Sequence, residues 1–503
     1  MVVATYSEYH RDRIGWFFGL QGWQLVLLAV AALPVLGLVQ RGAWTAALAG
    51  AGVWVLTLVV VAVPVRGRSA TGWLLASLAF LLGRRAGWTR WRSRAATGAA
   101  QDLAEADLPG VLQAVQIHDG PPHGPHQVRV AVAQNHALST WAVTAQVTHP
   151  GIGMADSADR DRQGHGLAEL LDLAARTELI EEVLFTVRTV PDDGAERDLW
   201  VRKHRKPGGP ELSRRVNDDL RQSLTGASVR TETFVTLVVP EARMGRPARE
   251  AGGRLEGRAR VLYGLMGEVE AQLSGGLGMT QVAWLTSPQL ALVCRTGFAP
   301  GDRAGIVEAL AAHTQDSGVN ADVPWALAGP SGADPVARHY SHDAWNSVSV
   351  TLQLPTKGAV LGALAPVLTP GEAGERRSLL VAFPILAQSV ADRRTANNEW
   401  AADLGEELRA RARMKVRARQ RAETAKARGV DVQLARGSCL TRPYAVATVT
   451  VPKTARVAEY GRRLDAAVRR AGFAPLRLDL AHDVAFAAST VPLGVSLTRK
   501  ATR

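Results

Sequence analysis

The chain has 503 residues and a formal net charge of +13, with 59 Lys and Arg against 46 Asp and Glu. Single hydrophobic cores stop growing near about 250–300 residues, so this length excludes one compact domain. Two segments carry the excess charge, each with a net +8, which excludes a chain that is basic throughout. Residues 1–100 hold ten Arg against Glu8 and Asp12, residues 409–428 hold nine Lys and Arg against Glu423, and the remainder is slightly acidic.

Two long apolar segments follow a short N-terminal segment, residues 1–19, which we expect to be cytoplasmic. Residues 20–39 and 43–65 contain no charged side chain, and only three residues separate them. About 20 apolar residues span the hydrocarbon core of a bilayer as a helix. A cleaved signal peptide has a single apolar region of about 7–15 residues, and a helical hairpin buried in a soluble core is the other alternative. We therefore predict a transmembrane hairpin, with Arg41 in its elbow.

Arginine and tryptophan are interleaved after the second apolar segment. This pattern in residues 69–94 predicts a helix in the membrane interface, with indoles at headgroup depth and guanidinium groups on anionic lipid. A buried helix of the first lobe is the alternative. Arginines on the outer flanks of the hairpin place both chain ends in the cytoplasm, since positive charge is retained on that side. The predicted membrane-interface residues are Arg66, Arg68, Arg84, Arg85, Trp88, Arg90, Trp91, Arg92 and Arg94.

The remaining chain predicts an α+β fold, arranged as two cytoplasmic α/β lobes with mixed or antiparallel sheets. Val-rich segments that alternate apolar and polar residues predict strands, and apolar residues at helical spacing predict helices. The first lobe is expected at residues 105–280, with strands at 127–133, 138–147, 181–190 and 229–239 and helices at 164–176 and 249–273. The second is expected at residues 281–503, with strands at 347–354, 378–385, 444–451 and 475–480 and a helix at 455–472.

A long basic helix is predicted at residues 387–428 of the second lobe, since about 40 residues pass there without proline. Its arginines alternate along the chain, so at 3.6 residues per turn they surround the helix instead of forming one stripe. Nucleic acid or lipid headgroups are possible targets. A solvated helix, or one that packs on an acidic partner, is an equal alternative. The candidate contact residues are Arg409, Arg411, Arg413, Lys415, Arg417, Arg419 and Arg421.

Motifs of catalysis are absent from the sequence, which contains no GxxxxGK[ST], HExxH, GxSxG, GxGxxG or paired-cysteine zinc pattern. His118, His123 and His126 are separated by Pro and Gly and predict a solvated turn instead of a metal site. The consecutive residues Ser341, His342 and Asp343 predict a loop at a strand start, because triads are assembled from distant positions. Asp192-Asp193 predicts a turn, and Cys294 and Cys439 are expected to be free thiols. We expect no enzyme activity, cofactor or metal.

Several segments resemble a family of actinobacterial conjugation-associated membrane proteins. They are Arg338-His339-Tyr340, Asp343-Ala344-Trp345, SVSVTLQLP at 347–355, RRSLLVAFPILAQSVADRRTA at 376–396 and RRLDAAVRRAGFAPLRLDLAHDVAFAASTVPLG at 462–494, together with FTVRTVPDDGAERDLW at 185–200. Members of this family look like a PrgI-like two-helix inner-membrane subunit of type IV secretion fused to the part of a conjugation ATPase (CagE, TrbE and TraC type) that precedes its nucleotide-binding domain.

The resemblance implies a non-catalytic inner-membrane scaffold of a type IV-like DNA-transfer apparatus. It stops where the nucleotide-binding domain of the ATPases begins, so ATP hydrolysis is expected from a separate transfer ATPase. Other secretion-channel subunits, the phospholipid membrane and an oligomeric assembly are the further expected partners. Two alternatives remain open: an EccE-like structural subunit of type VII secretion, and a membrane-tethered protein that binds nucleic acid through the basic helix.

Overall fold

The computed structural model describes residues 22–499 except 63, 66–67, 152–154, 207, 228, 356–357, 373, 387–428, 430–431 and 436; the side chains of residues 22–25, 60–71, 191, 222 and 224–227 are not described either. The described chain forms two compact units, one ending at Thr89 and one beginning at Arg90. The predicted basic helix at 387–428, with Arg409, Arg411, Arg413, Lys415, Arg417, Arg419 and Arg421, lies outside the described residues, as does Arg66.

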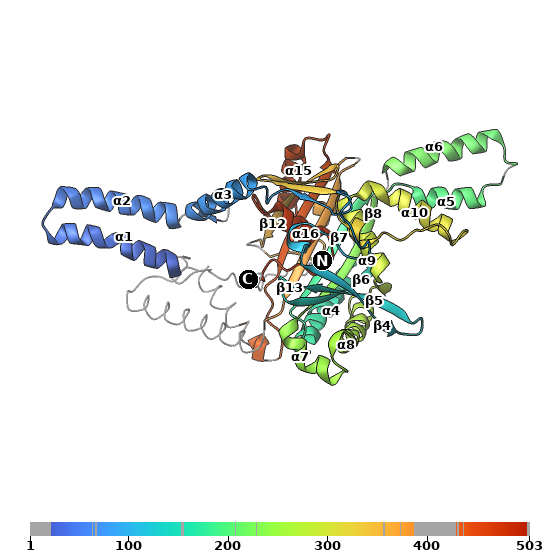
Figure 1. Cartoon of the computed structure of the whole chain (residues 1–503), viewed down its shortest axis with the longest axis horizontal. Helices are drawn as coiled ribbons and strands as arrows, with labels where there is room; N and C mark the ends of the chain where they lie inside the picture. Colours follow the sequence, from blue (N-terminus) through green and yellow to red (C-terminus); the bar gives the residue numbers. More distant parts are fainter. Residues whose placement is uncertain are drawn as a thin grey trace. The chain divides into compact units, whose positions relative to one another are not determined.

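The unit ending at Thr89 contains a hairpin of two antiparallel helices, α1 (Gly22–Gln40) and α2 (Trp44–Ala62) (Figure 1). Gly42 forms the turn between them at a φ of 70°, in the left-handed region that favours glycine. The Trp54 indole donates a hydrogen bond to the carbonyl of Leu28 across the hairpin, at 2.9 Å. The predicted elbow at residues 40–42 is thus confirmed.

Many large apolar side chains on this hairpin are exposed, among them Leu33 at 62% and Leu48 at 74%. Two short strands, β1 (Pro64–Val65) and β2 (Arg68–Ser69), lead to α3 (Ala70–Arg85). None of the helices within the described residues has both the length and the apolar character that a membrane crossing requires. The predicted transmembrane hairpin is therefore not supported by them.

In the unit beginning at Arg90, thirteen strands of described residues form one antiparallel sheet. The order along the sheet is β3-β10-β11-β12-β14-β13-β7-β8-β6-β5-β4, with β9 beside β6 and β15 beside β12. The strands are β3 (Trp91–Arg92), β4 (Val115–His123), β5 (Val128–Asn135), β6 (Thr140–Thr148), β7 (Glu182–Pro191), β8 (Val229–Pro240), β9 (Gln281–Trp284), β10 (Gly332–Val336), β11 (His339–His342), β12 (Trp345–Gln353), β13 (Arg376–Pro384), β14 (Tyr444–Pro452) and β15 (Ala474–Arg477).

Helices connect these strands and cover both faces of the sheet (Figure 1). They are η1 (Gly110–Leu112), α4 (Ser157–Arg176), α5 (Ala195–His204), α6 (Glu211–Ala227), α7 (Glu241–Glu250), α8 (Arg254–Gly275), α9 (Ser287–Phe298), η2 (Pro300–Asp302), α10 (Arg303–His313), α11 (Trp325–Ala328), α12 (Ala365–Leu368), α15 (Val457–Arg470) and α16 (His482–Thr490).

The sheet consists of two repeats with the same topology, which the sequence did not reveal. In the first repeat β4, β5 and β6 lie side by side, β8 pairs with β6, and β7 pairs with β8. In the second, β10, β11 and β12 lie side by side, β14 pairs with β12, and β13 pairs with β14. Each repeat then continues with one or two helices, a short strand that pairs with its third strand, and a final helix. These elements are α7, α8, β9 and α9 in the first repeat, and α15, β15 and α16 in the second.

The register of the strands shows that the repeats are related by an approximate two-fold axis. Thr144 pairs with Thr236 in the first repeat, as Ser349 pairs with Thr448 in the second, and both pairs are hydrogen-bonded through their hydroxyls, at 2.9 and 2.7 Å. The next strand places Leu184 beside Thr236 and Ser378 beside Thr448. Two residues further on, Thr186 and Leu380 therefore occupy equivalent positions, and they pair with each other across β7 and β13.

Three buried cores follow from this arrangement. One face of the sheet carries a core shared by both repeats, to which α9 contributes Phe298 and α16 contributes Phe486. On the other face α4 and α8 cover the first repeat and α12 and α15 cover the second, each with its own core. The two lobes expected from the sequence thus share one sheet. The first repeat ends with α9 at Phe298, whereas the sequence placed the boundary between the lobes at 280/281.

The mixed α+β class and the large antiparallel sheet are confirmed. The strands predicted around residues 128, 140, 182, 229, 347, 378 and 444 are all present. The turn predicted from the three histidines is partly wrong, because His118 and His123 lie in β4 and only His126 lies in the turn that follows. Pro121 and Pro122 are tolerated there because β4 is the edge strand and lacks a neighbour on its outer side among the described residues.

Candidate functional site

The predicted membrane-interface residues are divided between the two units. Arg84 and Arg85 end α3 and are exposed, and Trp88 follows with 84% of its surface exposed. Along α3, Leu74, Leu78 and Leu82 are exposed at a spacing of four residues, with Leu75 and Leu81 beside them, so they form one apolar stripe. Arg68 lies in β2.

The other members of that set belong to the unit beginning at Arg90. Trp91 and Arg92 form the edge strand β3, which pairs with β10, and Trp91 packs on the shared core. Arg92 binds Asp334 at 3.2 Å, Arg94 binds both Glu105 and Asp107, and Arg90 is exposed. The structure therefore does not bring the predicted residues together in one helix.

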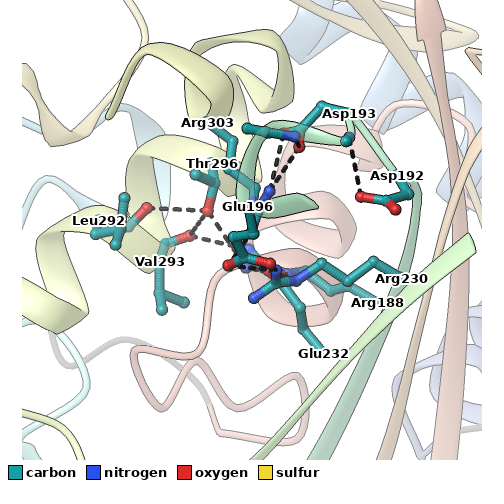
Figure 2. Close-up of polar contacts among 12 residues, drawn as sticks. Arg188, Asp192, Asp193, Glu196, Arg230, Glu232, Leu292, Val293, Thr296 and Arg303 are labelled. Carbon is teal, nitrogen blue, oxygen red and sulfur yellow. Dashed lines mark hydrogen bonds and ion pairs between the residues drawn. The ribbon is translucent and has the colours of Figure 1, made fainter. Parts of the chain in front are cut away.

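A buried network of charged side chains lies at the junction of the repeats (Figure 2). Arg188 of β7 faces Glu232 of β8 in the sheet register, and both side chains are at most 10% exposed. The guanidinium binds Glu232 through Nε and Nη2, at 3.1 and 2.6 Å. Its Nη1 donates to the carbonyls of Val293 in α9 and Thr490 in α16, and Nη2 also lies 3.5 Å from the hydroxyl of Thr296. All five donors of Arg188 are thus accounted for.

A second guanidinium extends the network to the helices α5 and α10. Arg303, which begins α10 and is 7% exposed, binds both carboxylate oxygens of Asp193 at 2.8 and 2.9 Å and Glu196 at 2.7 Å. Arg230 of β8 binds Glu196 as well. The predicted turn at Asp192-Asp193 is present between β7 and α5, but Asp193 is bound to a buried arginine instead of being solvated.

The surrounding arginines keep the carboxylate of Glu232 ionised. Burial alone raises the pKa of Glu232, and the charge and hydrogen bonds of Arg188, with Arg230 and Arg303, outweigh it, so the pKa lies below its ordinary value. Charged pairs of this kind cost desolvation free energy but are strongly destabilising to break, because one charge is then left buried alone. The arrangement fixes β7, β8, α5, α9, α10 and α16 to each other, and we describe it as a positioning network.

Sequence reasoning missed this network, although a signal for it was present. Arg188 interrupts the apolar strand EEVLFTVRTV, and Glu232 interrupts VRTETFVTLVV. A charged residue at an inward position of a strand is rare unless it is paired. What the sequence could not supply is the pairing, because Arg188 and Glu232 lie 44 residues apart and the register of their strands depends on the fold.

The triplet Ser341-His342-Asp343 does not form a catalytic group. Ser341 and His342 lie in β11, and His342 is fully buried, with its Nε2 hydrogen-bonded to the hydroxyl of Ser347 at 2.9 Å. Burial lowers the pKa of His342 to about 3, so the ring is neutral. Asp343 turns away at a φ of 42° and binds Arg295. His342 and Asp343 thus have separate structural partners.

Glu182, at the start of β7, is the second buried carboxyl of interest. It is 2% exposed, and its Oε1 is buried without a hydrogen-bond partner. Burial raises the pKa of Glu182 to about 7, although hydrogen bonds with Ser496 and Tyr444 oppose the shift. Ser496 belongs to the C-terminal segment after α16, so this carboxyl lies where that segment packs on the sheet.

Comparison with known proteins adds no assignment, since no protein-family model and no curated protein matches the chain. Within the described residues, no group of three or more His, Cys, Asp or Glu side chains is placed to hold a metal ion. Both cysteines are free. Cys294 of α9 is fully buried, which raises the pKa of its thiol to about 12.

The first prediction concerns the Arg188–Glu232 pair. We expect Arg188→Met to lower the free energy of unfolding by about 3–5 kcal/mol, because it leaves Glu232 buried with a single, longer ion pair. The double variant Arg188→Met/Glu232→Leu should be less destabilised than the single one. The measurement is urea unfolding. Arg162→Met on α4, which breaks an exposed pair with Asp159, is the control and should cost within about 0.5 kcal/mol. Equal losses in both single variants would contradict the prediction.

The second prediction concerns pH. The folded-state pKa of Glu182, about 7, lies above the ordinary value of 4.5, so its stabilising contribution is complete below pH 4.5 and is lost as the pH rises through 7. The loss is at most on the order of 3 kcal/mol. Glu182→Gln should abolish this decrease and be the more stable protein at alkaline pH, as measured by urea unfolding at a series of pH values. Glu181→Gln, which alters the neighbouring side chain bound to Arg499, should retain the decrease.

Proposed function

We propose that this protein is a non-catalytic scaffold at the cytoplasmic membrane, which holds a separate transfer ATPase in a type IV-like conjugative DNA-transfer apparatus. The observation that carries the proposal is the combination, in one chain, of an apolar helical hairpin with a sheet domain whose second repeat contains the resembling segments. Residues 338–345, 347–355, 376–384 and 462–494 belong to that repeat, from β11 to the end of α16 and the residues after it. The resembling segment at 185–200 contains Arg188, Asp193 and Glu196 of the positioning network.

The surface of the hairpin supports membrane attachment. In α1 and α2 the sides that face away from the partner helix carry exposed apolar side chains, among them Leu33, Leu36 and Val39 in α1 and Val53, Leu56 and Val59 in α2, and the sides between the helices are apolar as well. A helix that is apolar all round requires an apolar surrounding. Leu28 of α1 and Ala47 of α2, in contrast, are buried, at 6% and 5% exposed. The lipid bilayer is the surrounding that we propose, with the leucine stripe of α3 at its surface.

The helix α6 has an exposed apolar side, which supports a partner-binding surface on the sheet domain. Leu212, Val216 and Leu220 follow each other at a spacing of four residues and are 74%, 50% and 51% exposed. They share one side of the helix. Asp218 lies two residues from both Val216 and Leu220, and therefore on the opposite side, where it binds Arg205 after α5.

The helix α6 lies beside α5 (Figure 1). Its ion pairs are made on the side toward α5 and its apolar side is exposed, the reverse of the usual arrangement for a helix on a soluble domain. Arg221 adds a second ion pair with Asp198 of α5, which fixes this orientation. Exposed apolar patches of this kind mark interaction sites. We propose that the transfer ATPase binds α6.

The third prediction tests membrane attachment. Leu48→Arg places a charge on an exposed position of α2, and in a bilayer this costs about 2.5–3.5 kcal/mol at the helix centre. We expect the variant to be extracted from membranes by alkaline carbonate while the wild type stays in the pellet. Leu212→Arg on α6 is the matched control, because Leu212 is also 74% exposed, and it should behave as the wild type does. If Leu48→Arg sediments as the wild type does, the hairpin is not held in lipid.

The fourth prediction tests the scaffold role. The full chain, purified in detergent from cells engaged in conjugation, should copurify a P-loop ATPase, as identified by mass spectrometry. Replacing Leu212, Val216 and Leu220 together by Ser should reduce the recovered ATPase at least about tenfold, which corresponds to about 1.4 kcal/mol of binding free energy. A control with Leu103→Ser, at an apolar residue that is 53% exposed, should leave recovery unchanged. Wild-type protein that never recovers an ATPase would contradict the scaffold proposal, and undiminished recovery by the triple variant would contradict the α6 surface alone.

A further inference from the structure

A small cavity lies where the two repeats meet, at the C-terminal ends of α9 and α16. Its volume is about 20 Å³, which is room for one small ion or one water molecule. It is lined by Arg188 of β7, Arg376 and Ser378 of β13, Thr450 of β14, and the helix residues Thr296 and Thr490. Arg188, Arg376 and several hydroxyls therefore line one partly open space, between strands from both repeats.

The two arginines differ in their partners. Arg188 uses all five of its donors on Glu232, two helix carbonyls and Thr296, as described above. Arg376 is different, because its Nε and Nη1 atoms are buried and have no hydrogen-bond partner among the described residues. Its guanidinium lies over the ring of Trp345, with Cζ 4.4 Å from the ring centroid. That contact stabilises the cation but satisfies none of its N–H groups.

The carboxylates closest to Arg376 are already bound. Asp193 and Glu232 attract its charge, but Asp193 is held by both oxygens on Arg303, and Glu232 is held by Arg188. Burial, followed by repulsion from Arg188, lowers the pKa of Arg376 to about 9. Buried N–H groups in native proteins are almost always hydrogen-bonded, and buried charges are paired. The described chain therefore supplies no hydrogen-bond partner for Nε and Nη1 of Arg376.

A free hydroxyl hydrogen is available beside this guanidinium. Ser378 and Thr490 share one hydrogen bond between their hydroxyl oxygens, at 2.8 Å, and both line the cavity. Two hydroxyls have two hydrogens, and the bond between them uses only one. The cavity thus combines an unpaired cation with a neutral donor, which is the combination that binds an anion.

We propose that this cavity binds a small inorganic monoanion, with chloride as the simplest occupant, which accepts hydrogen bonds from Arg376 and from the Ser378–Thr490 hydroxyl pair. The anion neutralises the charge of Arg376 and shields it from Arg188. Because Arg188 lies on β7 and Arg376 lies on β13, the anion stabilises the junction of the repeats. The proposal concerns the sheet domain alone and is independent of the scaffold role.

The fifth prediction follows from linkage between anion binding and folding. The full chain in detergent is heated in sodium chloride and in sodium gluconate at equal ionic strength, since gluconate is too large for the cavity. We expect the melting temperature to be higher in chloride and to rise by about 2 °C for each tenfold increase of chloride above its dissociation constant. Arg376→Met, which keeps an apolar contact with Trp345 but removes the charge, should melt at the same temperature in both salts.

Three controls make the result decisive. Arg462→Met removes an exposed arginine of α15 and should keep the wild-type difference between chloride and gluconate. Arg376→Lys keeps the charge with fewer donors and should keep a smaller difference, which separates anion binding from a general effect of altering the site. Crystals grown in bromide should show an anomalous peak within hydrogen-bonding distance of Arg376. Equal melting temperatures of the wild type in both salts, or an undiminished chloride effect in Arg376→Met, would show that the cavity holds only water and would overturn the proposal.

Discussion

The pairing of β7 with β13 is the interaction on which the sheet domain depends. Each strand is the free edge of its own five-stranded arrangement, and the antiparallel ladder from Glu182–Pro384 to Thr189–Arg377 joins them. An unpaired edge at this position would expose a row of backbone donors and acceptors. The ladder therefore joins two repeats with two edges each into one sheet, whose end strands among the described residues are β3 and β4. It also aligns α9 and α16 over one common core.

Polar groups at this junction explain why the pairing has a single register. Arg188 pairs with Ser378 across the ladder, with Glu232 on the next strand, and with carbonyls of α9 and α16 above it. A shift of one residue would move Arg188 to the opposite face, because strand side chains alternate. It would then enter the apolar layer under α4 and α8 without its partners. Stability is supplied chiefly by the apolar cores, and the buried arginine makes the alternative registers unfavourable.

Much of the fold was predictable from local patterns, and the part that was not depends on long-range pairing. Alternation in residues such as Val143, Val235 and Val449 marks strands because it requires only one buried face. The repeat was not detectable, since the equivalent pairs Thr144–Thr236 and Ser349–Thr448 share hydroxyls but little else in their surroundings. The predicted membrane-interface set followed from local composition alone, and it crosses from one unit into the other at Arg90 because nothing local marks Trp91 as an edge strand.

The two repeats also carry a long connection at the same place in their topology. The connection from the fourth to the fifth strand is long in both: β7 ends at Pro191 and β8 begins at Val229, while β13 ends at Pro384 and β14 begins at Tyr444. The paired ends lie at the surface, where an insertion leaves the ladder intact. In the first repeat this connection forms α5 and α6, fixed at its base by Asp193 and Glu196 on Arg303. This connection is anchored at its base by the buried charge network and exposes the apolar stripe of α6, which is the division that a binding element needs.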